Sequence, residues 1–267
     1  MKSAYKMVEK HIAGTTMMSA LAKAKEANSK GLLVSMSFLS EPPSDMIKSR
    51  YITNTYMQLA RQLSRLSING NVHVPVWQLG ISLDEGMAVG NLRRIMDTCA
   101  TYGIFQWYEV NDEHDISAVR KAGSKGYGIA FGSIELAMKY MRARKMADAK
   151  LVFTGFSGED IRLDEKEVEK TIKAAIESCE KLTLSSVPDN VLYKFIRKGK
   201  ARRTTIIEMQ YGYEKMISEA YKSGYDVSVL MPFGKDWIRY ALSKIPSGKL
   251  HSLASSLLEP GADLEIL

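Results

Sequence analysis

The chain of 267 residues is about 45% apolar and 25% charged, which is the composition of an ordinary globular protein. Its longest clean apolar stretch, residues 31–39, is far shorter than the roughly 20 residues of a membrane-spanning helix. The first residues form no hydrophobic leader, so we expect a cytoplasmic protein. Cys99 and Cys179 are too few for a disulfide framework or a zinc site, and we interpret both as buried small hydrophobic residues. The net charge of +7 permits a polyanionic partner but does not require one.

Short β-rich runs alternate with amphipathic helical patterns from one end of the chain to the other. Several of these runs are almost continuously apolar, as strands buried on both faces should be. The predicted strands are residues 32–38, 72–77, 104–110, 128–133, 151–156, 182–187, 204–209 and 226–231.

Between these strands, apolar residues recur at helical spacing. The clearest stripes fall within residues 47–66, 87–99, 168–179, 216–221 and 237–241. Asp164, followed three residues later by Glu167, resembles a capping box at the start of the third stripe. We predict a leading helical extension over residues 1–30 and a barrel domain over residues 31–267.

Eight βα units in one unbroken series favour the α/β class and a single closed (β/α)8 barrel of the TIM type. A doubly wound open sheet is the alternative, but it usually has fewer strands. No glycine-rich nucleotide-binding turn follows the first predicted strand. The working face of such a barrel lies at the carboxyl ends of its strands.

Carboxylates and other polar residues follow the predicted strands and would meet at this face. They are Glu41, Gln78, Glu109, Asn111, Asp112, Glu113, His114, Ser133, Glu135, Ser157, Glu159, Asp160, Asp189, Glu208, Lys235 and Asp236. The run from Glu109 to His114 could form an acid–base or metal site, but its spacing matches no metal-binding geometry. We therefore favour a solvated acidic loop there. His73 lies inside the second strand and is interpreted as a hydrogen-bonded core histidine.

Basic residues collect in the segments that enter two strands, on the opposite face of the barrel. They are Arg142, Arg144, Lys145 and Lys150 before the fifth strand, and Lys194, Arg197, Lys198, Lys200, Arg202 and Arg203 before the seventh. Such a face could contact an anionic partner such as RNA, an acidic protein surface or the mouth of a second copy. An exposed, lysine-rich helix end is the simpler interpretation.

The second predicted strand carries a more specific pattern, Val-His-Val-Pro-Val-Trp-Gln-Leu-Gly-Ile over residues 72–81, followed by Asn-Leu-Arg-Arg-Ile over 91–95. This resembles the proline dehydrogenase family, whose pattern is V-S-V-K-L-x-Q-L-G-L with a following N-L-x-x-I helix. Residues 37–41, 209–212 and 231–237 resemble further family motifs in the same order. The resemblance covers roughly residues 32–245 and implies a distorted (β/α)8 barrel that holds FAD.

The resemblance also implies site residues, most of which are substituted. The family's second-strand lysine falls on Pro75, and the tyrosine of the eighth strand falls on Leu230. The arginine pair that clamps the substrate carboxylate falls on Ser243 and Lys244, which cannot form the same bidentate fork.

Fewer family positions keep a related side chain. The third-strand aspartate falls on Glu109, and the arginine of the fifth-strand motif falls on Lys150. On this resemblance, Glu109 and Lys244 occupy catalytic positions. Lys150, Glu208 and Tyr211 would contact the flavin if it is bound.

Two tryptophans bear on whether a flavin fits. If Glu109 points into the barrel, the two-residue period of a strand also turns Trp107 and Phe105 inward. The same period counted from Pro75 turns His73 and Trp77 inward. Both tryptophans could then fill space that a flavin ring needs.

The loss of the lysine, the tyrosine and the arginine pair favours a catalytically degenerate family member. It would act as a binding or regulatory protein for an unknown small molecule at the barrel mouth, and it would hold no flavin. The first alternative is an active FAD-dependent dehydrogenase that oxidises proline or a related secondary amine. The second alternative is a scaffold that binds RNA or another polyanion through its basic face.

Overall fold

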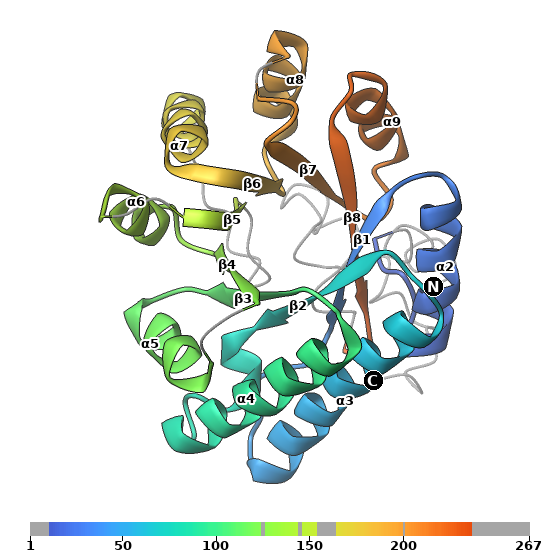
Figure 1. The fold of residues 1–267 in the computed structure, drawn as a ribbon, viewed down its shortest axis with the longest axis vertical. Helices are drawn as coiled ribbons and strands as arrows, with labels where there is room; N and C mark the ends of the chain where they lie inside the picture. Colours follow the sequence, from blue (N-terminus) through green and yellow to red (C-terminus); the bar gives the residue numbers. More distant parts are fainter. Residues whose placement is uncertain (1–10, 124–125, 144–145, 154–163, 200, 237–267) are drawn as a thin grey trace, which may run out of the picture.

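The computed structural model describes residues 11–123, 126–143, 146–153, 164–199 and 201–236. Eight strands in chain order close into a barrel in which each strand is parallel to its neighbours, and helices surround it (Figure 1). The predicted (β/α)8 barrel is thus confirmed. The strands are β1 Leu33–Phe38, β2 Gly70–Pro75, β3 Gln106–Val110, β4 Tyr127–Phe131, β5 Met146–Val152, β6 Cys179–Ser185, β7 Thr205–Gln210 and β8 Asp226–Phe233.

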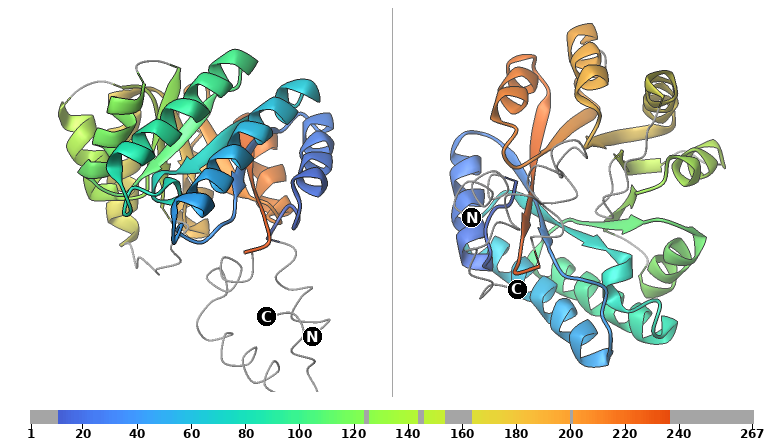
Figure 2. Two further views of the ribbon diagram at one scale, coloured as in Figure 1. Left: turned by 90° about the horizontal axis from the view of Figure 1, so that it is seen from below. Right: turned by 180° about the vertical axis from the view of Figure 1, so that it is seen from behind.

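The helices that follow the strands pack against the outside of the barrel. They are α3 Met46–Arg65, α4 Glu85–Tyr102, α5 Glu113–Ala122, α6 Ile134–Ala143, α7 Glu165–Ser178, α8 Asp189–Lys198 and α9 Glu214–Lys222. The long helices α3 and α4 lie side by side along one flank, as Figure 2 shows. Among the helices of the described ranges, none has the length and apolar character needed to span a bilayer.

Ahead of the barrel, α2 (Met17–Ser29) supplies the leading helix expected within residues 1–30. Its buried face consists largely of alanines, including Ala20 and Ala24, and it contacts β8 and β1. The short side chains allow the helix to approach the strands closely. The division into an extension and a barrel domain remains a prediction.

The main apolar core lies between the barrel and its helices. Alternate strand residues such as Val34, Met36 and Val72 face outward and meet buried helix residues such as Ile52 and Leu59. The other half of each strand faces the barrel interior, which holds several polar side chains, among them Ser35, Lys150 and Glu208. A small apolar cluster of Trp107, Ala130 and Val152 lies apart from the main core.

The strand register sorts the interior residues into layers of four, each supplied by alternate strands. We define three of these layers, beginning in the middle of the barrel and moving toward the carboxyl ends. The middle layer is Ser35, Trp107, Lys150 and Glu208; the next is His73, Ala130, Ser185 and Leu230; the mouth layer is Ser37, Glu109, Val152 and Gln210.

The second strand ends two residues earlier than the sequence pattern indicates. Pro75 is its last residue, because proline has no N–H with which to extend the ladder. The chain turns instead into a short 3-10 helix, η1 (Val76–Leu79), which Gly80 closes with a φ of 88°. Trp77 is therefore not a strand residue, and the two-residue period does not turn it inward.

The fifth strand differs most from its prediction. It spans Met146–Val152 rather than 151–156, and residues 154–156 lie outside the described part of the chain. The polar residues Asp148 and Lys150 alternate with Ala149 and Leu151, and this alternation is a strand pattern whose polar face is turned inward. Lys150 is thus an interior residue and not part of a basic loop.

The cysteines are buried, as expected, although Cys179 begins β6 and is not in the preceding helix. Burial raises the pKa of the Cys99 thiol to about 12 and that of Cys179 to about 11. Neither thiol is therefore activated as a nucleophile.

We predict that Gly80→Ala lowers the free energy of unfolding by about 1–3 kcal/mol, because a side chain is strained at this positive φ. A Cβ there would also lie 2.7 Å from Met87 Cε and 2.9 Å from Ser49 Oγ. Gly90→Ala in α4 is the matched control. A Cβ at Gly90 meets no atom within 4 Å, so this change should stabilise by about 0.5–1 kcal/mol. Urea unfolding of both variants checks the prediction, and equal effects would contradict it.

Candidate functional site

A chain of four ionisable side chains crosses the interior of the barrel. Lys150 Nζ lies 2.5 Å from Glu208 Oε1 and 2.9 Å from His73 Nδ1, and His73 Nε2 lies 2.7 Å from Glu109 Oε2. All four residues are at most 1% exposed. They come from β5, β7, β2 and β3, so only closure of the barrel brings them together.

The three N–H groups of the Lys150 ammonium are matched by three acceptors. Besides Glu208 and His73, the Ser35 hydroxyl lies 3.5 Å away and donates its own proton to Asn71 Oδ1 at 2.7 Å. The ammonium also lies 5.7 Å from the centre of the Trp107 ring, within the range of a cation–π contact. Lys150 therefore has no donor left for a cofactor.

Two serine hydroxyls also donate hydrogen bonds to the buried Glu208 carboxylate. Ser185 donates to Glu208 Oε1 at 2.8 Å and Ser228 donates to Oε2 at 3.3 Å. Buried charges are tolerated only when paired and hydrogen-bonded, and both conditions hold for Glu208. The small interior residues of β6 and β8 thus satisfy this carboxylate.

The contacts of His73 define its protonation state. Lys150 donates to Nδ1, so the ring proton sits on Nε2 and is donated to Glu109. Burial and the neighbouring Lys150 charge lower the pKa of His73, which favours the neutral imidazole. This confirms the interpretation of His73 as a hydrogen-bonded core histidine.

The cluster carries unequal charge. Burial raises the pKa of Glu208, but Lys150, His73 and the Ser185 hydroxyl together outweigh burial and the net shift is downward. Burial also lowers the pKa of Lys150, against the opposing effect of Glu208. With Lys150 protonated, His73 neutral and both Glu208 and Glu109 ionised, the buried group has one net negative charge. That excess lies toward the mouth, where Glu109 stands.

The mouth layer combines Glu109 with two further polar side chains. Ser37 Oγ is buried and makes no hydrogen bond of standard geometry to any described residue. Among the described residues, the Gln210 amide donates one long hydrogen bond, to Ser186 Oγ at 3.4 Å. Polar atoms left this loosely bonded favour a ligand that can donate and accept hydrogen bonds.

Trp107 points inward as predicted, but it belongs to the middle layer, two residues before Glu109 in β3. A Cβ at Gly128 would clash with the Trp107 ring, so the glycine makes room for it. Phe105 precedes β3, is 36% exposed and contacts the Trp107 ring edge-on at 5.1 Å between centroids. The tryptophan therefore fills the middle of the barrel.

Other residues expected at the working face have structural roles. The Gln78 side chain accepts from the Tyr56 hydroxyl and donates to the carbonyls of Phe38 and Ser40. Asn91 donates to Ser49 Oγ and to a carbonyl of η1. The motif residues Gln78 and Asn91, which carry the family resemblance, are thus buried parts of the framework.

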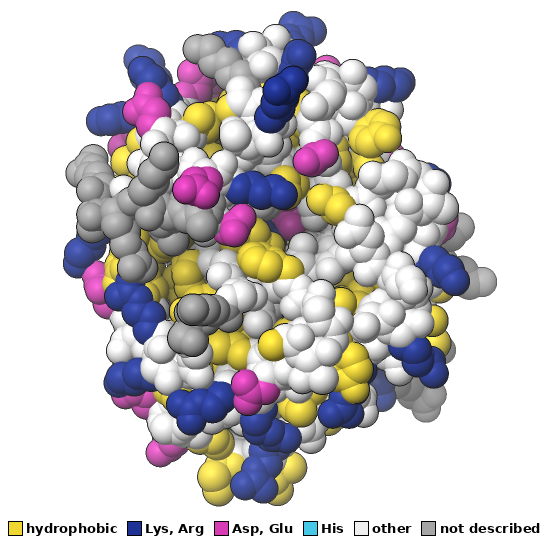
Figure 3. All heavy atoms as spheres, in the orientation of Figure 1, with side chains coloured by type: hydrophobic (Ala, Val, Ile, Leu, Met, Phe, Trp, Pro, Cys, Tyr) yellow, Lys and Arg dark blue, Asp and Glu magenta, His cyan; other side chains and the backbone are white. Residues whose placement is uncertain are grey.

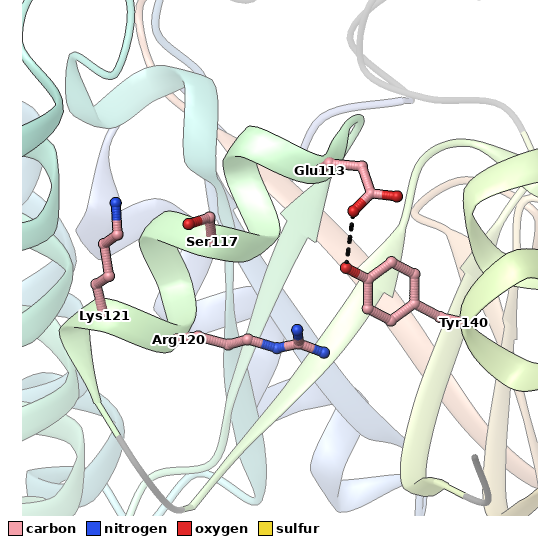
Figure 4. Close-up of a pocket in the computed structure, with 5 residues that line it drawn as sticks. All are labelled: Glu113, Ser117, Arg120, Lys121 and Tyr140. Atoms are coloured by element: carbon pink, nitrogen blue, oxygen red, sulfur yellow. Dashed lines mark hydrogen bonds between the residues drawn. The ribbon is translucent and has the colours of Figure 1, made fainter. Parts of the chain in front are cut away.

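The acidic run after β3 forms the start of a helix. Asp112 caps α5 by accepting from the Asp115 amide at 2.9 Å, and His114 pairs with Glu85 at 3.4 Å. Glu113 lies outside the barrel, in a groove between α5 and α6 where it accepts from Tyr140 (Figure 4). Lys139 and Tyr140 lower the pKa of Glu113. Glu109 therefore stands apart from this run.

Within the described ranges, no group of three or more His, Cys, Asp and Glu residues could hold a metal ion. Several other predicted top-face residues, Ser157, Glu159 and Asp160, lie outside those ranges.

The family positions divide into three groups. Glu109, Lys150 and Glu208 come together inside the barrel, and Leu230 lies in the same layer as His73. Tyr211 faces outward, with Lys23 of α2 4.8 Å from its ring centre, so it does not join them. Ser243 and Lys244 lie outside the described residues.

The predicted basic face is partly neutralised where it is described. Lys194 pairs with Glu165 at 2.8 Å and Lys198 pairs with Glu169 at 3.7 Å, both across to α7. On the face shown in Figure 3, basic and acidic side chains are interspersed. The side chains of Arg142, Arg144, Lys145 and Lys200 lie outside the description, and Lys150 is buried. A partner at this face remains a prediction.

Sequence reasoning missed the hydroxyl and amide groups that support the cluster: Ser35, Asn71, Ser185 and Ser228. Their signal is a small polar residue at every second position of an apolar strand, as in Ser35 and Ser37 of β1. That alternation marks a polar barrel interior.

A closed parallel barrel with a buried charged cluster below its mouth is the architecture of a (β/α)8 protein with a site at the carboxyl ends of its strands. No family model matches the chain. Proline dehydrogenase 1 of Bacillus subtilis (strain 168) is 22% identical over 262 residues, which covers 88% of this chain and 84% of that protein. Proline dehydrogenase 2 of Bacillus subtilis subsp. natto is 22% identical over 257 residues, with the same coverage.

Solved structures show the same fold. Proline utilization A (PutA) from Bdellovibrio bacteriovorus inactivated by N-propargylglycine has a TM-score of 0.71 at 15% identity, covering 95% of this chain. PutA from Corynebacterium freiburgense has a TM-score of 0.65 at 12% identity, covering 97%. This chain spans about a third of these PutA chains, 32% and 31% respectively. Together with the barrel, the near full-length sequence matches support the resemblance of this chain to the proline dehydrogenases.

We predict that Lys150→Met lowers the free energy of unfolding by about 3–5 kcal/mol, because it leaves the Glu208 carboxylate buried and unpaired. The double variant Lys150→Met/Glu208→Leu should recover most of this loss, since it removes both charges. Urea unfolding measures both. A single variant as stable as the parent would show that the ion pair does not govern the interior.

A second prediction concerns pH. Because the pKa of His73 is lowered in the native barrel, the unfolded chain binds a proton below about pH 6.5 that the native chain does not bind. This contribution to stability is present above that pH and is lost as pH falls from about 7 to 5. Chemical unfolding at several pH values should therefore show that the free energy of unfolding falls less steeply with decreasing pH for His73→Asn than for the parent. The exposed His114→Gln is the control and should keep the parent's slope.

Proposed function

We propose that this protein is an oxidoreductase of the proline dehydrogenase type that oxidises a secondary amine at the mouth of the barrel. The observation that carries the proposal is the buried chain from Glu208 through Lys150 and His73 to Glu109. Apolar residues in its place would often stabilise a barrel equally well or better. Clusters of buried ionisable groups in a cleft are typical of functional sites.

The resemblance implies FAD as the cofactor, and the mouth layer fits the polar edge of a flavin ring. Ser37 Oγ and the Gln210 amide are the buried polar atoms with unused hydrogen-bonding capacity there. Trp107 lies in the layer below, so its ring does not occupy the mouth layer. The apolar residue of the mouth layer is Val152, which is small. A bound flavin would supply the acceptor for the two electrons that amine oxidation releases.

Charge at the mouth favours a cationic substrate. Glu109 is held by His73 through one carboxylate oxygen, and below it the Lys150 charge is already paired with Glu208, so the negative charge of Glu109 is left to face the mouth. Secondary amines are protonated near neutral pH, so their nitrogen complements this charge. The sequence replaces the family's arginine pair with Ser243 and Lys244, and this favours a substrate that does not depend on a bidentate carboxylate clamp.

The second candidate is a catalytically degenerate protein that binds a small molecule or regulates a partner. Two observations favour it: Pro75 stands at the family lysine position, and the Lys150 donors are all used internally. A scaffold that binds an anionic partner through the basic face is a separate, third proposal, and a cytoplasmic location is proposed whichever function holds.

We expect the purified protein to take up FAD and keep its visible absorbance through gel filtration. It should reduce a redox dye with pyrrolidine, the amine without a carboxylate, faster than with L-proline, at a rate on the order of 1 per second. Glu109→Gln should lower this rate about tenfold or more, since it removes the charge that faces the amine. The exposed Glu177→Gln in α7 is the matched control and should leave the rate unchanged.

A colourless protein that reduces no dye with either amine would overturn the enzyme proposal. The degenerate binding protein would then be the better description.

A further inference from the structure

The strongest unexplained feature of the site is His73. The family pattern quoted above has serine at this position, whereas this chain places an imidazole between two layers of the barrel. We propose that His73 is a positioning residue: as a neutral imidazole protonated at Nε2, it fixes the Glu109 carboxylate at the mouth and joins it to Lys150 in the middle of the barrel. The kinetic part of this inference rests on the proposed function, whereas its structural part does not.

With Lys150 as an ammonium and Glu109 as a carboxylate, the two hydrogen bonds of His73 allow one arrangement of protons on its ring. Glu109 is a carboxylate that accepts from Nε2–H at 2.7 Å, and Lys150 is an ammonium that donates to Nδ1 at 2.9 Å. A second proton on His73 would place two donors face to face at Nδ1. Lys150 therefore opposes protonation of His73 by geometry as well as by charge.

The neighbouring position explains why the donor comes from His73. Pro75 is the direct register partner of Glu109 across β2 and β3, and its side chain has no polar atom. His73 lies two residues deeper on the same face of β2, and its long side chain reaches Glu109 from below. The positive charge that compensates Glu208 and Glu109 lies on Lys150, which is deeper in the barrel than Pro75.

The titratable groups around the imidazole come from three strands: Glu109 of β3, Lys150 of β5 and Glu208 of β7. Its layer is otherwise filled by Ala130, Ser185 and Leu230. Protonation of His73 would therefore be opposed by one ammonium and favoured by two carboxylates, in a site without water-exposed surface. Removal of Lys150 together with Glu208 should leave Glu109 to dominate and allow His73 to become charged.

Nitrogen-15 NMR of the four histidines, with the ring nitrogens labelled, tests the structural part without any activity. We expect one imidazole to stay neutral from about pH 8 to pH 5 with its proton on Nε2, and its signals to be absent in His73→Asn. In Lys150→Met/Glu208→Leu the same imidazole should titrate within this range. His114→Gln removes a different signal and serves as the assignment control. A His73 ring that titrates near its ordinary pKa in the parent, or that carries its proton on Nδ1, would overturn the proposal.

Two substitutions separate the two contacts of His73 in the kinetic test. Gln at position 73 keeps a donor at about the reach of Nε2, and Asn does not. We expect His73→Asn to lower kcat/KM for the amine about 10- to 100-fold and to change the pH profile, and His73→Gln to restore most of the activity. Equal losses in both variants with the parent's pH profile would show a merely structural residue. If the parent is inactive, the NMR result still decides the position of the proton, so failure of the proposed function is distinguishable from failure of this inference.

Discussion

The ion pair between Lys150 and Glu208 is the constraint on which the interior of this barrel depends. Both groups are fully buried, and desolvation of two charges is tolerable only where attraction and hydrogen bonds repay it. The hydroxyls of Ser35, Ser185 and Ser228 supply those hydrogen bonds. The small polar residues of β1, β6 and β8 therefore follow from the presence of one lysine on β5.

From this pair a chain of ionisable side chains extends toward the mouth. His73 carries it up to Glu109, and the middle layer is closed on the other side by the Trp107 ring. An excess negative charge consequently lies at the end of the barrel where a (β/α)8 protein binds its ligand. Hydrogen bonds through His73 link Glu109 at the mouth to Lys150 in the middle of the barrel. A substitution of Lys150 should therefore alter the hydrogen bonding of Glu109.

The residues that carry the family resemblance stabilise the barrel framework and do not belong to the buried charged cluster. Gln78 ties η1 to the end of β1, Asn91 ties α4 to η1, and Gly80 turns the chain between them. These are geometric requirements of the barrel, so they can persist while positions such as Pro75 and Leu230 change. Similarity to the Bacillus proline dehydrogenases at 22% identity is consistent with such a division, and the chemistry of this chain has to be argued from its own interior.

The sequence by itself determined the order of strands and helices, the closed barrel, the burial of both cysteines and the burial of His73, because apolar periodicity reports directly on local structure and burial. It misplaced β5 and Trp77, since a lysine among apolar residues is typical of a loop and a strand pattern does not show where proline ends the ladder. Only the tertiary structure decided that Lys150, Glu208, His73 and Glu109 form one cluster. They are distant in the chain, His73 and Lys150 being 77 positions apart, and closure of the barrel brings them into contact. A buried charge is stable only with such partners, and no local pattern specifies partners that lie on other strands.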